Sequence, residues 1–335
     1  MKKIDKKNLD SIFKRINEVY TLFLPKKDGE NLSFLPYENR NEIDLNTLKT
    51  TLPLKEFLFP QSETFLKFKK EGKKIDFQVQ DVNEKNYVVF GVRPCDMKSV
   101  EILDEIFLRE PIDTYYKARK DNGIFITLGC SNPESSCFCD SFDIDPLGVE
   151  NALSDISLIE KDDFYYWITN SEKGKKIESL LTEYLEKIEN IKFDKIESFK
   201  IKDIDLNNLD QDLKSVFENE TLWKNLARRC LGCGSCTYIC PTCHCYDVND
   251  YKGNNSGERF KCWDSCMFSD FTLMAHGNPR TNQMQRVRQR FMHKLVYFPE
   301  NHNGKIACVG CGRCIEKCPV HIDIVKVIKK LEVKK

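Results

Sequence analysis

The sequence contains no apolar run of about 18 residues, which is the length that a membrane-spanning helix needs, so we expect no membrane span. It also has no excess of charge of one sign, because 52 lysines and arginines balance 52 aspartates and glutamates. Neither nucleic acid nor an anionic membrane surface is therefore expected as a partner. The basic start of the chain is followed by polar residues and not by the apolar core of a signal peptide, which predicts a cytoplasmic protein.

Nucleotide-binding motifs are also missing. No G-x-G-x-x-G follows a predicted strand, which argues against a Rossmann dinucleotide site, and the chain has no G-x4-G-K-[ST] loop. We find no serine or cysteine nucleophile motif either. The sequence thus shows no site for turnover of an organic substrate, and we expect a subunit that is not itself catalytic.

Cysteine is absent from residues 1–94 and 140–229, yet the chain has 16 cysteines, most of them between Cys230 and Cys318. Disulfides are rare in the reducing cytoplasm, and the chain is too long for a disulfide-stapled miniprotein. Clustered thiols in such a chain are typical of metal binding.

Hydrophobic periodicity predicts an α+β protein with two parts. A helical period over residues 6–20 indicates an amphipathic helix, and short apolar runs predict buried strands at residues 87–92, 123–128 and 164–168. We expect Asp96 to cap a helix after the first strand, and residues 173–188 to form an exposed helix. Strand and helix alternation predicts an α/β domain over residues 1–190.

The chain changes character after this domain. Residues 191–225 are polar and are interpreted as a connection. Residues 226–335 are expected to form a mainly helical, ferredoxin-like domain with a long insertion, ending in a short helix over residues 325–333.

One cysteine motif occurs twice in this second domain. Both copies read C-x2-C-x2-C-x3-C-P, the first from Cys230 to Pro241 and the second from Cys308 to Pro319. This spacing is typical of proteins that bind two [4Fe–4S] clusters, in which the fourth cysteine of each motif ligates the other cluster. The predicted ligands of the first cluster are Cys230, Cys233, Cys236 and Cys318. Those of the second are Cys308, Cys311, Cys314 and Cys240.

Zinc is the alternative metal for such thiols, because zinc ribbons also use C-x2-C pairs. A zinc site needs only two such pairs, however, and two full copies of a four-cysteine motif with a following proline favour iron–sulfur clusters.

A third cluster is predicted in the first domain. Cys95 and Cys130 each follow a predicted buried strand, so both are expected at the same edge of a parallel sheet. Cys137 and Cys139 follow shortly after, and the four thiols could hold a further [4Fe–4S] cluster. The alternative is that some of them are small buried hydrophobic residues.

The last four cysteines leave two interpretations open. Cys243, Cys245, Cys262 and Cys266 could form a fourth metal site, with His244 as an extra ligand, or they could pack beside the other clusters. A basic stretch from Arg280 to Lys294 is interpreted first as a solvated or docking face. Its alternative role is charge compensation for anionic clusters.

Several of these motifs resemble a family of iron–sulfur subunits, which serve anaerobic sulfite reductases and, as the beta subunit, cytosolic NiFe sulfhydrogenases. The resemblance rests on G-V-R-P-C-D at residues 91–96, C-F-C at 137–139, C-P-T-C-H-C-Y at 240–246, W-D-S-C at 263–266, R-V-R-Q-R-F-M-H-K at 286–294 and the second ferredoxin motif. Residues 1–90 are not covered by it. The family is expected to lack a cysteine at the position of Cys262 in many members, which weakens the fourth site.

The resemblance implies an electron-transfer subunit. Family members stand between a flavoprotein subunit that oxidises NAD(P)H and a catalytic redox subunit, which is a sulfite reductase, a hydrogenase or a heterodisulfide-reductase-like protein. A free-standing ferredoxin that shuttles between enzymes is the alternative, although such a carrier has no need of a 190-residue first domain.

Overall fold

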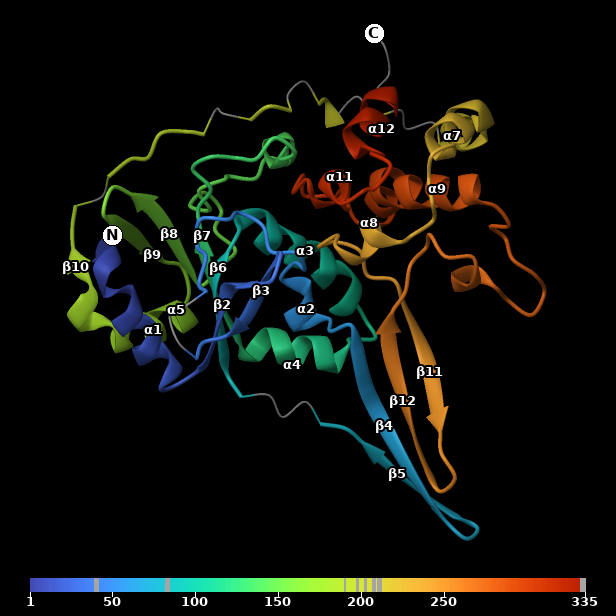
Figure 1. The fold of residues 1–335 in the computed structure, drawn as a ribbon, viewed down its shortest axis with the longest axis horizontal. Coiled ribbons are helices and arrows are strands. Elements are labelled where there is room, and N and C mark those ends of the chain that lie inside the picture. Colours follow the sequence, from blue (N-terminus) through green and yellow to red (C-terminus); the bar gives the residue numbers. More distant parts are fainter. Residues whose placement is uncertain are drawn as a thin grey trace.

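A computed structural model describes residues 1–38, 42–81, 85–189, 191–196, 199–201, 204–206, 209 and 213–331. Among these residues, no helix combines the length and the apolar character that a membrane crossing requires. The architecture is α+β, as predicted, with a large sheet in the N-terminal part and short helices in the C-terminal part (Figure 1).

An eight-stranded sheet organises the N-terminal part, in the order β10-β1-β9-β8-β7-β6-β2-β3. Its four central neighbours β8, β7, β6 and β2 are parallel, and the flanking pairs are antiparallel. The strands are β1 (Lys2–Asp5), β2 (Thr21–Asp28), β3 (Asn31–Pro36), β6 (Tyr87–Val92), β7 (Gly123–Leu128), β8 (Ile156–Lys161), β9 (Phe164–Thr169) and β10 (Glu186–Lys187).

Helices cover both faces of this sheet. On one face α1 (Leu9–Asn17) and α5 (Glu172–Leu180) pack against strand residues such as Val88 and Ile126. The other face packs against α2 (Lys55–Leu58), α3 (Pro94–Phe107) and α4 (Thr114–Asn122). The inner strands β6 and β7 are buried along their whole length, as their continuous apolar runs predict.

The predicted strands at residues 87–92, 123–128 and 164–168 are confirmed, and two helix predictions need correction. The helix after β6 begins at Pro94, because proline suits the first helical turn, so Asp96 lies inside the helix and does not cap it. The predicted helix over 173–188 ends at Leu180 and is followed by a 3-10 turn, Thr182–Tyr184, and by β10. There Glu186 and Lys187 pair with β1.

The C-terminal part consists mainly of short helices around a second apolar core that includes Trp223, Phe291 and Ile328. Its helices are α6 (Leu213–Glu218), α7 (Glu220–Ala227), α8 (Ser235–Tyr238), α9 (Gln283–Met292), α10 (Phe298–Asn301), α11 (Arg313–Glu316) and α12 (Ile324–Leu331), with a π-helical turn at His293–Tyr297. α12 confirms the predicted last helix up to Leu331, and the rest of that prediction lies outside the described residues.

A second, four-stranded antiparallel sheet joins the two parts and extends away from the body (Figure 1). We call it the wing. It has the order β11-β12-β4-β5 and is made of β4 (Ser62–Glu71), β5 (Lys74–Val79), β11 (Tyr246–Lys252) and β12 (Ser256–Trp263). The long insertion between the cysteine motifs thus contributes a hairpin that pairs with the N-terminal part through β12 and β4.

Candidate metal centres

The two cysteine motifs have the same local backbone. In the first, Gly232 and Gly234 have φ angles of 70° and 73°, and α8 begins directly after Gly234. In the second, Gly310 and Gly312 have φ angles of 61° and 77°, and α11 begins directly after Gly312. These left-handed positions favour glycine and let the chain curl so that its thiols can surround one volume.

The first predicted ligand set lines one cavity. Cys230, Cys233 and Cys236 lie on one side of it, and Cys318 comes from the other motif. Main-chain and side-chain donors point at two of these sulfurs: Ile322 N donates to Cys318 Sγ at 3.2 Å, and Gln283 Nε2 donates to Cys230 Sγ at 3.3 Å. A cavity lined by four thiols from both motifs is the arrangement that crossed ligation requires.

The second predicted set is Cys308, Cys311, Cys314 and Cys240. Burial raises the pKa of Cys308 to about 11 and those of Cys311 and Cys314 to about 12, and the charge of Cys240 adds to the rise in all three. The structure therefore places Cys240 near the three thiols of the other motif. Lys294 Nζ donates to Cys240 Sγ at 3.3 Å.

The third predicted set gathers at the edge of the large sheet. Cys95 opens α3 behind β6, and Cys130 follows β7, so the two parallel strands end at the same edge as predicted. Burial raises the pKa of Cys139 well above its usual value, and the charges of Cys130 and Cys137 add to it. Burial likewise raises the pKa of Cys95, with a contribution from Cys139.

The loop of the third set contacts the second motif directly. Phe138 N donates to the carbonyl of Gly310 at 2.9 Å. A Cβ on Gly312 would lie 2.5 Å from the carbonyl oxygen of Ser136, so the glycine is what permits the contact. The loop that carries Cys137 and Cys139 therefore rests directly on the loop that carries Cys311.

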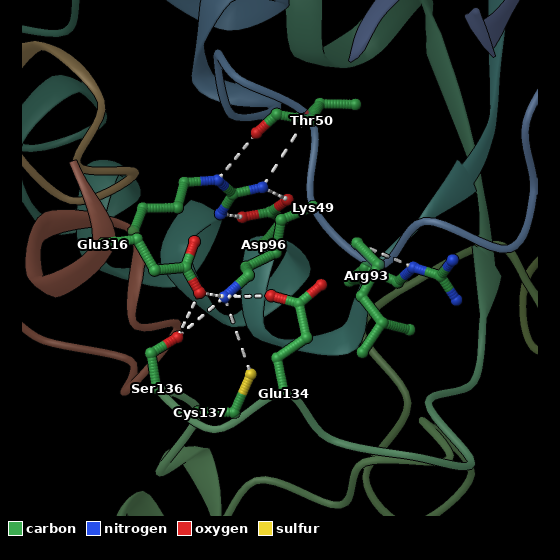
Figure 2. A network of polar contacts seen from close by, with 10 residues as sticks. Lys49, Thr50, Arg93, Asp96, Glu134, Ser136, Cys137 and Glu316 are labelled. Carbon is green, nitrogen blue, oxygen red and sulfur yellow. Dashed lines mark hydrogen bonds and ion pairs between the residues drawn. The ribbon is translucent and has the colours of Figure 1, made fainter. Parts of the chain in front are cut away.

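Ion pairs surround this junction (Figure 2). Arg313 and Asp96 form a buried bidentate pair, with distances of 2.6 and 2.7 Å between guanidinium nitrogens and carboxylate oxygens. Lys49 contacts Glu134 at 2.6 Å and also Glu316, Ser136 and the sulfur of Cys137 (Figure 2). Although burial opposes it, the charges of Cys137, Glu134 and Glu316 raise the pKa of Lys49 to about 12.

Arg93 links the end of β7, next to Cys130, to a neighbouring loop. Its guanidinium donates to the carbonyl oxygens of Leu128 and Gly129 on the strand that leads to Cys130, and to three carbonyls of the 45–48 loop. Burial raises the pKa of Cys130 to about 11, and the charge of Arg93 opposes that rise.

The last four cysteines do not lie together. Cys243, Cys245 and Cys266 are neighbours, whereas Cys262 lies apart from them. The side chains of Cys245 and Cys266 lie close together, as do those of Cys240 and Cys243, so that each pair shares its protons. Cys262 lies on β12, where its sulfur accepts a hydrogen bond from Asn249 Nδ2 at 3.4 Å. The ring of His244 lies against His293 and Phe298, and its Nδ1 is 3.0 Å from the carbonyl oxygen of Thr242.

The basic stretch from Arg280 to Lys294 is only partly exposed to solvent. Arg290 and Lys294 are 5% and 3% exposed, so the first interpretation as a solvated face is wrong for these two residues. The cysteines around Arg290 include Cys236 of the first set and Cys314 of the second. Its Nε is buried without a hydrogen-bond partner among the described residues, as expected if an anionic cluster lies beside it.

Single-ion sites present a different geometry. Within the described ranges, no three histidine, cysteine, aspartate or glutamate side chains lie close enough to hold one metal ion. The thiols of the first set instead surround a cavity.

Comparison with known proteins agrees with this geometry. Residues 229–322 match the family model described as a 4Fe-4S dicluster domain. The chain is also 31% identical over 342 residues to Sulfhydrogenase 2 subunit beta of Pyrococcus furiosus, and the match covers 98% of this chain and 97% of the relative. This chain belongs to the sulfhydrogenase beta-subunit family.

The family assignment confirms the resemblance inferred from the motifs. As a sulfhydrogenase beta-type protein, the chain is an iron–sulfur electron-transfer subunit with two [4Fe–4S] clusters in its dicluster domain. The match also extends over residues 1–90, which the motifs did not cover. No solved structure matches the chain significantly.

Buried cations are the functional residues that sequence reasoning missed. Lys49 and Lys55 come from segments far in sequence from the cysteines beside them, and no spacing rule connects them. Arg313 lies inside the second motif, but its carboxylate partner Asp96 is distant in sequence. Charge compensation was considered only for the basic stretch itself.

Proposed function

We propose that this chain relays single electrons through three [4Fe–4S] centres inside a cytoplasmic oxidoreductase complex. The proposed ligands are the crossed sets of the dicluster domain and, for the third centre, Cys95, Cys130, Cys137 and Cys139. When bound, each cluster supplies one-electron redox chemistry.

The observation that carries the proposal is the contiguity of the three thiol groups. Cys311 of the second set lies close enough to Cys95 and Cys139 of the third set for its charge to raise the pKa of both thiols. The charge of Cys236 bears on Cys314, which links the second set to the first. Each set thus lies beside the next, and the first set includes the exposed Cys233.

The residues of this chain bind the clusters, bury them and compensate their negative charge. Glycines of the motifs let the backbone approach, and burial limits water. Arg290, Lys294, Lys49 and Arg313 supply positive charge beside sulfur. Such charge stabilises the reduced, more anionic state of a centre and raises its potential.

The first centre is the end that reaches the surface. Cys233 is exposed, and Leu231 next to it is 68% exposed. This apolar position suits contact with a partner's redox subunit, because the buried core of a protein interface is more apolar than the rest of the surface. The two partners that we propose are a flavoprotein subunit that oxidises NAD(P)H and a catalytic redox subunit.

An iron count tests the third centre. The anaerobically purified Cys130→Ser variant should lose about 4 Fe per chain relative to the unmodified protein. The Cys262→Ser variant is the matched control and should lose none. An unchanged iron content in Cys130→Ser would show that the third centre does not exist.

Reduction kinetics test the relay. The clusters should bleach with NADH or NADPH only when the proposed flavoprotein subunit is added, and the two proteins should copurify. Reduction by unrelated ferredoxin-dependent enzymes at equal rates, with no stable complex, would support the free-standing carrier instead.

A further inference from the structure

Three thiols, of which Cys266 is buried and Cys243 and Cys245 are partly buried, remain outside the three centres proposed above. Cys243 and Cys245 lie between the first cysteine motif and β11, and Cys266 follows β12. Asp264 N donates to the carbonyl oxygen of Cys245 at 3.0 Å and so joins the two segments, and the side chains of Cys245 and Cys243 lie near that of Cys266. We call these residues the thiol trio.

Cys262 does not belong to this group. On β12 its neighbour Trp263 is buried against Phe59, and alternation along a strand turns Cys262 to the opposite face. There it pairs across the ladder with Asp247 and Ser62 and contacts Asn249. The sequence position suggests a helical i, i+4 pair with Cys266, but the segment is a strand followed by a loop.

A buried cation faces the thiol trio from the N-terminal part. Lys55 of α2 is 2% exposed, its Nζ donates to the carbonyl of Cys243 at 3.0 Å, and it lies 4.0 Å from the centre of the Trp263 ring. Burial lowers the pKa of Lys55 to about 8, and the charges of Cys243, Cys240 and Cys245 oppose that fall. A buried lysine in such a place needs an anion, because an isolated charge is costly to bury.

The trio also touches the second centre. Cys243 N donates to the carbonyl oxygen of Cys240, the crossed ligand of that centre, at 3.4 Å, and the Arg290 guanidinium lies near both residues. A redox group on the trio would therefore lie beside the relay, within reach of an electron from it.

We propose that Cys243, Cys245 and Cys266 bind a fourth iron–sulfur cluster, a cubane held by three cysteines, with Lys55 as its buried counter-ion. Three thiolates suit a [3Fe–4S] cluster, or a [4Fe–4S] cluster whose fourth iron takes a ligand from outside the trio. This centre extends the proposed relay, but its detection does not depend on the relay's partners.

Iron content and native mass test the proposal on the full chain. Cys266→Ser and Cys245→Ser should each lose about 3–4 Fe per chain, while Cys262→Ser should retain all of it. Native mass spectrometry of the unmodified holoprotein should show the mass of one cluster more than the other centres account for. This second measurement decides the matter even where a variant fails to fold.

The opposite results are equally definite. Unchanged iron in both variants, a native mass without the additional cluster, or a zinc ion on the trio would overturn the proposal. The relay is judged separately, because loss of the trio's cluster should leave the EPR signals of the two dicluster centres in place. Absence of those signals from the unmodified protein would instead contradict the relay itself.

Discussion

Cations buried against sulfur are the main residue-scale feature of the candidate centres. Lys294 is held by Cys240 Sγ at 3.3 Å, Thr242 Oγ1 at 2.8 Å and the carbonyl of Ala307 at 2.9 Å. The charges of Cys240 and other thiols outweigh burial and raise its pKa, so it stays protonated. A charge-assisted hydrogen bond to a ligand sulfur is one of the means by which a protein sets a cluster potential.

We expect Lys294→Met to lower the potential of the second centre. Loss of a charged hydrogen bond to the ligand disfavours the more anionic reduced state, and the shift should be on the order of tens of millivolts. Redox titration followed by EPR measures it. Lys305→Met, which removes a lysine that pairs with Glu105 at the surface, is the control and should leave the potential unchanged.

A second residue-scale prediction concerns the pair of Asp96 and Arg313. Asp96→Ala should lower the free energy of unfolding by about 3–5 kcal/mol, because it leaves a buried guanidinium without its carboxylate. Anaerobic denaturant titration gives the value. Glu220→Ala breaks an exposed i, i+4 pair with Lys224 and should have little effect. Equal losses in both variants would contradict this account.

Spacing rules predicted the ligand residues but not their counter-ions. The motifs place Cys230 and Cys318 in separate ligand strings, and the cavity brings them together as the crossing rule requires. The pairing of Asp96 with Arg313 depends on how the two parts pack. Asp96 was expected as a helix cap because it is a capping residue type, yet Pro94 had already fixed the helix start.

At the scale of elements, the glycines of the second motif matter for their space as well as their φ angles. Gly312 lies against Ser136, and Gly310 lies against the carbonyl of Phe138. Gly304 also has a positive φ, 80°, but an added Cβ there would meet nothing within 4 Å. A comparison of substitutions at Gly312 and Gly304 therefore separates the cost of backbone strain from the cost of steric overlap.

We predict that Gly312→Ala costs about 1–3 kcal/mol more stability than Gly304→Ala, because only the first also overpacks a contact. Thermal unfolding of the holoproteins compares them. Gly312→Ala should also lose iron from the second and third centres, since it displaces the 136–138 loop from the motif. If the two variants behaved alike, backbone strain alone would account for the need for glycine at this junction.

The elements of the large sheet were predictable where the period was clear. β6, β7 and β9 are short apolar runs, and all three lie where the sequence indicates. The wing was not predictable, because β4 pairs with β12 about 190 positions further along the chain. Its outermost strand β5 is exposed throughout, so burial leaves no periodic signal there.

At the scale of the whole molecule, the centres lie where the two parts meet. Lys49 and Lys55 from the N-terminal part reach the cysteine-bearing segments, and β12 pairs with β4. The large sheet has its own core, which includes Val88, Ile126 and Trp167 and contains no cysteine. The two parts should therefore respond differently to loss of iron.

Iron removal by a chelator under reducing conditions should loosen residues 226–331 more than the large sheet. Without cluster anions, Arg290 and Lys294 are buried cations with less to balance them. Hydrogen exchange followed by mass spectrometry should show faster exchange in α8, α9 and α11 and little change in β6, β7 and β8. A uniform rise across the chain would mean that the sheet has no independent stability.

The cavity shared by Cys230 and Cys318 bears on the way the protein is made. A ribosome releases the first motif long before the second, so a nascent chain presents three thiols of the first set without their fourth. The second set, which includes Cys240, is complete only once synthesis has passed Cys314, and the first set only once it has passed Cys318. Premature termination before Cys314 should therefore leave both sets of this domain without all of their ligands.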